Sequence, residues 1–154
     1  MFKVGIIGAG WIAEKMAEAL APLEDYCVHA IASRSLEKAE EFAGRWNIAK
    51  AYGSYEELVA DDEINLVYIA TPHSHHFQHA MLALEHGRNV LVEKAFTANA
   101  QEAEILIRTA HEKGLFITEA IWTRYMPLSH KVKEVMESGI IGEPRVLTAT
   151  LCYM

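Results

Sequence analysis

The pair Glu93-Lys94 directly follows an apolar run, 89–92, and could carry proton-transfer chemistry. Oxidation of a hydroxyl group by hydride transfer needs a base for the hydroxyl proton, and the reverse reaction needs an acid. A lysine that is partly desolvated beside a cationic nicotinamide has a lowered pKa and can serve in both directions. Glu93 could orient the ammonium group or hold the end of the strand in place. Taken alone, the pair is equally consistent with a structural Glu–Lys ion pair.

A histidine-rich segment follows Thr71-Pro72 and offers a second set of polar groups. Two imidazoles among His75, His76 and His79 have helical spacing and could bind a metal ion, but no nearby carboxylate completes a ligand set. We therefore expect no metal site here. His76, at the start of a helix, is instead expected to line a nicotinamide pocket with Thr71 and Pro72.

The segment 8–13, Gly-Ala-Gly-Trp-Ile-Ala, has the spacing of a dinucleotide-binding turn. Gly8 permits a tight turn, Gly10 lets the backbone approach a pyrophosphate, and Ala13 allows close packing of a helix on a strand. Because the segment lies between the first strand and the first helix, a bound dinucleotide is expected to contact Gly8, Gly10, Trp11, Ile12 and Ala13. The alternative is a tight turn without a ligand.

The residues after the second strand bear on the choice of cofactor. An NAD-preferring site usually has Asp or Glu here to bind the ribose hydroxyls. This chain has Ser33-Arg34, with Lys38 one turn further on. A guanidinium in place of a carboxylate favours a ribose 2′-phosphate, so we expect NADP, with NAD as the second choice. In the competing interpretation, Arg34 is a solvated residue at a helix start.

A regular alternation of strands and helices must position these groups. It indicates an α/β Rossmann fold, a doubly wound parallel sheet with helices on both faces. The expected strands are 3–7, 26–32, 50–52, 64–70, 89–92 and 115–121. The expected helices are 11–21, 35–45, a short helix capped by Ser54, 74–86, and one that begins near Asn99 and ends at Gly114.

The ends of three expected strands carry polar residues. These are the segments 71–76 and 93–94, and Glu119 followed by Trp122 and Arg124. Ligands bind outside the carboxyl ends of the strands in such a sheet. Convergence of three polar strand ends on one edge therefore favours proton transfer by Lys94 over a purely structural pair.

The alternation changes after residue 122. A helix is expected at 128–138, and the run 145–154 alternates in hydropathy as a strand does. We expect a dinucleotide-binding domain at 1–122. The segment 123–154 is expected to hold a linker helix and the first strand of a truncated C-terminal α/β domain, because a terminal strand without a partner is unusual.

Composition restricts the classes of function. The 154 residues carry a formal net charge of −7, with 51% apolar and 23% charged residues. This acidic balance argues against a general nucleic-acid binder, and no segment reads as a membrane span or a signal peptide. Cys27 and Cys152 fit no disulfide or metal framework and are expected to be buried free thiols. We therefore expect a cytoplasmic protein.

Four sequence features together resemble the glucose–fructose oxidoreductase / inositol dehydrogenase (Gfo/Idh/MocA) family. They are the glycine turn, Ala70-Thr71-Pro72 followed by His76, Glu93-Lys94, and the segment 119–125, Glu-Ala-Ile-Trp-Thr-Arg-Tyr. The last of these looks like the branch that contains dihydrodiol dehydrogenase and NADP-dependent xylose dehydrogenase.

The resemblance implies an oxidoreductase that uses NAD(P) and acts on a sugar or a cyclic diol. It implies that Lys94 is the catalytic residue, that Glu93 and His76 lie at the cofactor, and that Trp122 and Arg124 lie near the cofactor and substrate at a domain junction. It further implies a homo-oligomer in the full-length form. This chain resembles only an N-terminal portion, which we expect to bind cofactor far better than it turns over substrate.

One residue departs from the family pattern. The family usually has proline after the lysine, where this chain has Ala95. Because a cis bond before a residue other than proline costs about 2.5–4 kcal/mol, we expect a trans Lys94–Ala95 bond.

Two further interpretations compete with an enzyme. The chain could be a nucleotide-binding module that binds or senses NAD(P) without catalysis. A structural α/β domain without a ligand would require the glycine turn to be idle.

Overall fold

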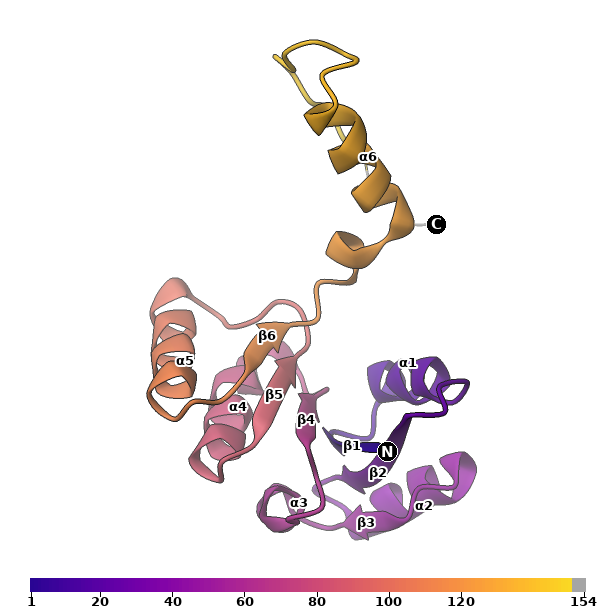
Figure 1. Ribbon diagram of the computed structural model, residues 1–154. Coiled ribbons are helices and arrows are strands. Elements are labelled where there is room, and N and C mark those ends of the chain that lie inside the picture. Colours follow the sequence, from indigo (N-terminus) through magenta and orange to yellow (C-terminus); the bar gives the residue numbers. More distant parts are fainter. Residues whose placement is uncertain (151–154) are drawn as a thin grey trace. The chain divides into compact units, whose positions relative to one another are not determined.

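The structure is a computed structural model and describes residues 1–150. The chain divides into two compact units, Met1–Ala120 and the segment from Ile121 onward (Figure 1). Each unit is described by itself below. Trp122 and Arg124 therefore belong to the second unit, whereas the other predicted site residues belong to the first.

The first unit is built on one parallel sheet of six strands (Figure 1). The strand order is β3-β2-β1-β4-β5-β6, so the chain reverses direction along the sheet between β1 and β4. This order defines the Rossmann fold, and its ligands bind at the point of reversal. The strands are β1 Phe2–Ile7, β2 Tyr26–Ala32, β3 Lys50–Tyr52, β4 Leu66–Ile69, β5 Asn89–Val92 and β6 Ile117–Glu119. The predicted fold class is confirmed.

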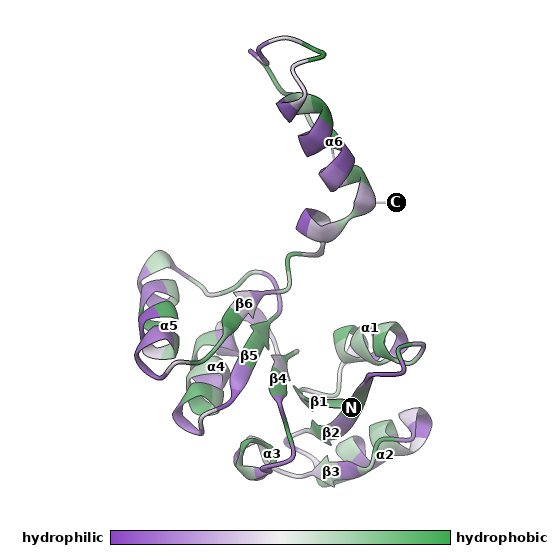
Figure 2. Ribbon diagram, viewed as in Figure 1, coloured by the Kyte–Doolittle hydropathy of each residue, from purple (hydrophilic) through white to green (hydrophobic). Residues whose placement is uncertain are grey.

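Helices cover both faces of the sheet, and each face has its own hydrophobic core. The helices are α1 Trp11–Leu20, α2 Leu36–Trp46, α3 Tyr55–Ala60, α4 His76–Glu85 and α5 Ala100–Glu112. Buried residues of α1 and α2 pack with one set of inward strand residues, and those of α3, α4 and α5 pack with the other. Strands covered on both faces are expected to be apolar throughout. Figure 2 shows mostly hydrophobic residues in β4 and in the later part of β5, while the helices carry both hydrophilic and hydrophobic residues. The early residues Lys3 of β1 and Asn89 of β5 are polar.

Side-chain caps fix the starts of three helices. Ser35 accepts a hydrogen bond from the backbone N–H of Lys38 at 3.4 Å, and Ser54 accepts one from that of Glu57 at 3.2 Å. Asn99 caps α5 in the same way, through the N–H of Glu102 at 2.9 Å. Each cap satisfies an N–H group that has no partner within its helix. These three helix starts are where the sequence predicts them.

Several predicted boundaries are too wide. The strand predicted at 64–70 is only β4, because Ile64 turns back to bond the carbonyl of Asp61 at 3.1 Å. The strand predicted at 115–121 is only β6. The helix predicted from residue 74 begins as a short 3₁₀ turn, η1 His73–His75, before α4.

The second unit contains a 3₁₀ turn, η2 Trp122–Tyr125, and one helix, α6 Pro127–Glu137. Pro127 occupies the first turn of α6, where a missing N–H costs nothing. The helix prediction is confirmed. The run predicted as a strand at 145–154 has no regular structure over residues 145–150, and its last four residues lie outside the described part. That it forms the first strand of a further domain stays a prediction. A strand needs a partner for its hydrogen bonds, and these six residues pair with none.

Two smaller predictions can be compared with residues 1–150. No helix in this range is both long and apolar enough to cross a membrane. Cys27 is a free thiol, but it is half-buried rather than buried because it lies near the outer end of β2. Cys152 lies outside the described residues.

Candidate functional site

The glycine turn joins β1 to α1 at the point of reversal in the sheet. Gly8 has φ +102°, and a Cβ atom there would lie 2.9 Å from the carbonyl oxygen of Ala70. Only glycine tolerates both the positive φ and this close approach to the end of β4. The N–H of Gly8 donates to the carbonyl of Ala32 at 2.9 Å, so the turn is tied to the end of β2 as well.

The start of α1 is open. Gly10 is its N-cap, no side chain caps the helix, and a Cβ atom at Gly10 would meet nothing within 4 Å. The unpaired N–H groups and the positive end of the helix dipole therefore face accessible space, as an anion site requires. Trp11 is exposed beside it, whereas Ala13 is fully buried against the sheet. A small residue at position 13 thus performs the packing predicted for it.

The end of β2 presents a cation with no acidic partner. Ser33 donates its backbone N–H to the carbonyl of Tyr52 at 3.2 Å, which orients the loop. Arg34 and Lys38 are exposed, and neither forms an ion pair within residues 1–150. Positive charge is therefore available at the position where an NAD-preferring site would have a carboxylate.

A pocket of about 270 Å³ lies beside Arg34. It connects the end of β2 to the end of β4 and the start of α4. Burial, with the adjacent His75 and His76 rings, lowers the pKa of His79 to about 4. His79 is therefore neutral at pH 7, and Arg34 is the cation of the pocket. The pocket is lined by Arg34, Tyr55, Thr71, Pro72, His75, Gln78 and His79.

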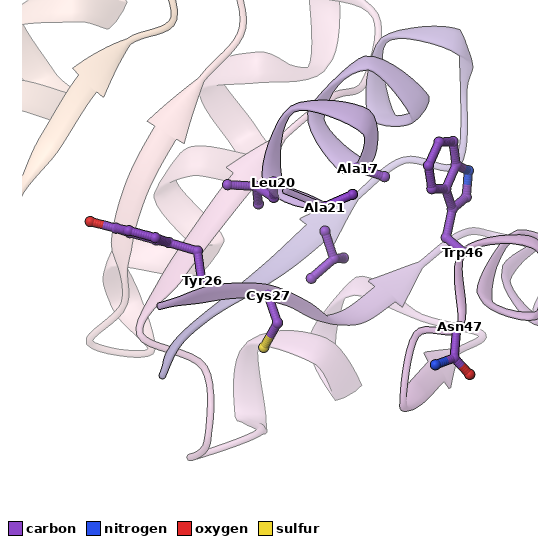
Figure 3. A pocket seen from close by; sticks show the side chains of 8 residues that line it. Ala17, Leu20, Ala21, Tyr26, Cys27, Trp46 and Asn47 are labelled. Carbon is purple, nitrogen blue, oxygen red and sulfur yellow. The ribbon is translucent and has the colours of Figure 1, made fainter. Parts of the chain in front are cut away.

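A second hollow, of about 170 Å³, lies between α1 and β2 (Figure 3). No charged side chain lines it. It therefore offers nothing that would hold a pyrophosphate. Its lining residues are Ala17, Leu20, Ala21, Tyr26, Cys27, Val28, Trp46 and Asn47.

His76 lies behind the strand ends, with 0% of its surface exposed. Its Nδ1 is 2.8 Å from the carbonyl oxygen of Ala95, and its Nε2 is 2.8 Å from that of Thr71. A carbonyl oxygen only accepts, so both bonds form together only when the ring carries two N–H groups. The ring thus ties the end of β4 to the end of β5, and neither nitrogen faces open space.

The Glu93 carboxylate does not bind the Lys94 ammonium. Its Oε1 accepts from the Tyr68 hydroxyl at 2.5 Å, and its Oε2 accepts from the backbone N–H of Lys94 at 3.1 Å. Burial and this acidic partner raise the pKa of Tyr68, so the phenol remains a donor. The exposed Lys94 ammonium forms no ion pair or hydrogen bond with another described residue. The predicted alternative of a structural Glu–Lys pair is therefore wrong.

The predicted trans peptide after Lys94 is also wrong, because the Lys94–Ala95 bond is cis. Two side chains hold the peptide group that follows this bond, between Ala95 and Phe96. His76 engages the carbonyl of Ala95, and Glu119 accepts the N–H of Phe96 at 2.8 Å. These long-range contacts specify the local conformation without the proline that the family usually has.

Sequence reasoning missed Tyr68 at this edge. It named Glu119 as a polar strand end but did not predict that this carboxylate binds the backbone N–H of Phe96. Tyr68 is an inward residue of β4 whose hydroxyl reaches the next strand end. The available signal was a tyrosine within an otherwise apolar parallel strand, since a buried hydroxyl requires a partner. Trp122 and Arg124 lie in η2 of the second unit, so the described first unit brings together all the predicted site residues except these two.

The strand order, the open glycine turn and the cationic end of β2 together define the class of protein. It is an NAD(P)-binding Rossmann domain.

The model of the Gfo/Idh/MocA oxidoreductase family, which has an NAD-binding Rossmann fold, matches residues 2–120. The chain belongs to this family, and the resemblance inferred from its motifs is confirmed.

Two relatives fall in the branch that the segment 119–125 indicates. D-xylose 1-dehydrogenase (NADP(+)) of Hypocrea jecorina is 51% identical, over 91% of this chain and 39% of that protein. Trans-1,2-dihydrobenzene-1,2-diol dehydrogenase of Mus musculus is 43% identical, over 94% of this chain and 44% of that protein. The chain therefore spans only about two-fifths of the length of these curated relatives.

Solved structures agree in fold. A 3-ketoreductase from Actinomadura kijaniata in complex with NADP has a TM-score of 0.84 at 32% identity, over 92% of this chain and 45% of that chain. An NAD binding oxidoreductase from Klebsiella pneumoniae has a TM-score of 0.86 at 29% identity, over 93% of this chain and 40% of that chain.

Proposed function

We propose that this chain is the cofactor-binding part of an NADP-dependent oxidoreductase in which Lys94 is the acid and base. The substrate would be a hydroxyl or carbonyl group of a sugar or a cyclic diol, as in the names of the xylose and dihydrodiol dehydrogenases. The observation that carries the proposal is an exposed, unpaired Lys94 ammonium on the sheet edge that holds the open glycine turn.

The residues present fit a dinucleotide. The turn at Gly8 and Gly10 leaves room for a pyrophosphate, which the N–H groups at Trp11 and Ile12 would hold at the helix start. Arg34, in the wall of the neighbouring pocket, would bind the ribose 2′-phosphate, assisted by Ser33 and Lys38. A bound NADP would supply the hydride acceptor or donor.

Lys94 would move the proton at the substrate oxygen. Among residues 1–150, its ammonium pairs with no carboxylate and is therefore available to a bound substrate. The neutral amine accepts the hydroxyl proton as hydride leaves the carbon, and the ammonium returns it in the reverse direction. Glu93 would act on the backbone rather than on the ammonium, since its two oxygens bind the Tyr68 hydroxyl and the Lys94 N–H.

His76 would be a positioning residue in this reaction. Both ring nitrogens bind backbone carbonyls, one of them directly after Lys94. Glu119 holds the next N–H from the opposite side. Because misplacement of a reacting group by about 1 Å can cost about 100-fold in rate, these buried contacts would fix where the lysine side chain begins.

The second unit would begin the part of the protein that completes the substrate site, with Trp122 and Arg124 near the cofactor and substrate. Assembly into a homo-oligomer stays a prediction. The free thiol of Cys27 is consistent with a reducing compartment, and we propose that the protein is cytoplasmic.

The test is the substitution Lys94→Ala in a protein of the relatives' length that contains this chain. We expect kcat with D-xylose or a dihydrodiol and NADP to fall by about 100-fold or more, because the proton then has no acceptor. The Kd for NADPH should change less than about twofold, since the lysine contributes little to ground-state binding. The exposed Lys113→Ala is the matched control and should leave both constants unchanged.

Loss of NADPH binding together with turnover would make Lys94 a structural residue. Unchanged turnover would reject the enzyme mechanism and favour a module that binds or senses NAD(P) without catalysis.

A further inference from the structure

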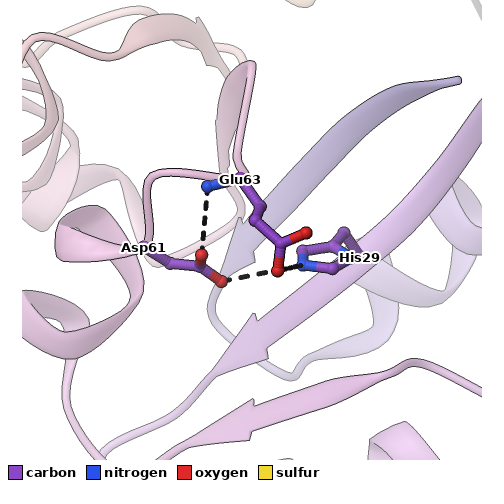
Figure 4. A group of neighbouring side chains, drawn as sticks. All are labelled: His29, Asp61 and Glu63. Carbon is purple, nitrogen blue, oxygen red and sulfur yellow. Dashed lines mark hydrogen bonds and ion pairs between the residues drawn. The ribbon is translucent and has the colours of Figure 1, made fainter.

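A second polar cluster lies at the amino ends of the strands, away from the glycine turn. His29, in β2, meets Asp61 and Glu63 from the loop between α3 and β4 (Figure 4). The register of β1 with β2 shifts by one residue between Val4 and Gly5, and His29 is the residue of β2 left without a partner. Such bulges re-aim a side chain, here toward two carboxylates.

The histidine is buried and its outer nitrogen is unsatisfied. Only 8% of His29 is exposed, and its Nε2 has no hydrogen-bond partner within the described residues. It lies 3.4 Å from Oε2 of Glu63 and 3.7 Å from Oδ2 of Asp61. Buried polar atoms nearly always have a hydrogen-bond partner, so a buried nitrogen that faces two carboxylates without one is unusual.

We propose that His29, Asp61 and Glu63 form a site for a divalent transition-metal cation such as Zn²⁺. The three donor atoms lie within 4.8 Å of one another. Ligands about 2.0–2.2 Å from a tetrahedral zinc are about 3.4 Å apart, which matches the histidine–glutamate separation. One imidazole with two carboxylates suits zinc and its neighbours, whereas calcium and magnesium take oxygen ligands.

Asp61 is already oriented for this role. Its Oδ2 accepts from the Tyr52 hydroxyl at 3.0 Å, and its Oδ1 accepts from the backbone N–H of Glu63 at 3.1 Å. Partners of this kind orient metal ligands and are typical of built sites. The Glu63 carboxylate is held by the ammonium groups of Lys3 and Lys50, each of which donates to one of its oxygens.

The Lys50 ammonium occupies the place of a cation in this structure. Its Nζ lies 2.9 Å from Oδ2 of Asp61 and 2.6 Å from Oε2 of Glu63, the two oxygens that also face His29. The side chain is 34% exposed, so it can turn into solvent when a metal ion enters. Metal and lysine are therefore competitors for the same pair of oxygens.

Because Lys50 and the metal ion compete, substitutions at His29 and at Lys50 should change the affinity for zinc in opposite directions. ZnCl₂ is titrated calorimetrically into the metal-free 154-residue chain, and CoCl₂ binding is followed by its visible absorption. We expect the wild-type chain to bind zinc. His29→Gln should weaken binding by about tenfold or more because a ligand is lost, and Lys50→Met should tighten it by a similar factor because the competing cation is gone.

His86→Gln, at an exposed histidine, and His75→Gln, in the histidine-rich segment, are the matched controls and should leave zinc affinity unchanged. Glu63→Gln, at a half-exposed position, covers the case in which His29→Gln fails to fold, and it should also weaken binding. The proposal is overturned if zinc fails to bind the wild-type chain, if His75→Gln rather than His29→Gln removes binding, or if Lys50→Met does not tighten it. NADPH takes no part in this titration, so its outcome is independent of the proposed function.

Discussion

The two ends of the parallel sheet differ in whether their cationic side chains form ion pairs. At the amino end, Lys3 and Lys50 form ion pairs with Glu63, and Lys50 also pairs with Asp61. At the carboxyl end, Arg34, Lys38 and Lys94 form no ion pair within residues 1–150.

The acids at the carboxyl end bind backbone and a phenol instead. Glu93 accepts hydrogen bonds from the Tyr68 hydroxyl and the Lys94 N–H, and Glu119 accepts one from the N–H of Phe96. Within residues 1–150, the unpaired cations on this edge leave positive charge available to an anionic ligand, although the chain as a whole has a net charge of −7. Unpaired cations, rather than the number of charged residues, therefore distinguish the carboxyl end of the sheet as the candidate ligand-binding edge.

The largest effect is expected at the glycine turn, which supports the whole carboxyl edge. In Gly8→Ala the new Cβ would lie 2.9 Å from the carbonyl oxygen of Ala70, at φ +102°. We expect a loss of about 2–4 kcal/mol in the free energy of unfolding, measured by urea denaturation, and loss of NADPH binding.

Gly87→Ala is the matched control, since Gly87 also has positive φ (+73°) but nothing lies within 4 Å of its new Cβ. It should cost about 1 kcal/mol and leave NADPH binding intact. Equal losses for the two variants would mean that the contact with Ala70 is unimportant.

Removing the two ring nitrogens of His76 is expected to have the next largest effect. In His76→Phe the ring shape is retained, but the carbonyls of Thr71 and Ala95 lose their donors. Since two buried acceptors are left unpaired, urea denaturation should show a loss of about 2–4 kcal/mol. His111→Phe, on the exposed side of α5, should change stability by less than about 0.5 kcal/mol. An unchanged free energy of unfolding for His76→Phe would mean that His76 does not stabilise the connection between β4 and β5.

His79 makes the carboxyl end sensitive to acid. Its pKa is about 4 in the folded chain because of burial, below the ordinary value of about 6.5 in the unfolded chain. The unfolded state therefore binds more protons between these values, so stability falls by about 2 kcal/mol as pH decreases from about 6.5 to about 4. Urea denaturation at pH 7.5 and 4.5 should show a smaller difference for His79→Gln than for the wild type. An unchanged difference would contradict the assignment.

The smallest effect is expected at the amino end. Lys3→Met removes the ion pair with Glu63, which lies at the surface. Exposed pairs contribute little and are screened by salt, so the melting temperature should fall slightly at low ionic strength and not at 1 M NaCl. A large fall in melting temperature that persists at 1 M NaCl would contradict this, because it would mean that the ion pair contributes much of the stability at this end of the sheet.

Local sequence signals predicted most of the fold. Strand–helix alternation gave the parallel sheet, Ser35, Ser54 and Asn99 marked helix starts, and the spacing of Gly8 and Gly10 marked the turn. These features depend on residues close together in the chain.

The predictions that failed depend on contacts between residues that are far apart in the sequence. The cis bond after Lys94 and the pairing of Glu93 with Tyr68 depend on groups up to 25 residues away, which no local pattern encodes. The hidden position of His76 follows from the carbonyl of Ala95, 19 residues later. The alternating run at 145–150 has no regular structure here, because a strand forms only where a partner strand exists.

The most direct test of the unpaired cationic edge is a titration of the 154-residue chain with NADPH and with NADH, followed by cofactor fluorescence. We predict that NADPH binds at least about tenfold more tightly, because Arg34 can pair with the 2′-phosphate. Arg34→Ala should abolish most of this preference, and the control Arg108→Ala, on the exposed face of α5, should retain it. Equal affinity for the two cofactors, a preference for NADH, or a preference that survives Arg34→Ala would contradict the assignment of this edge.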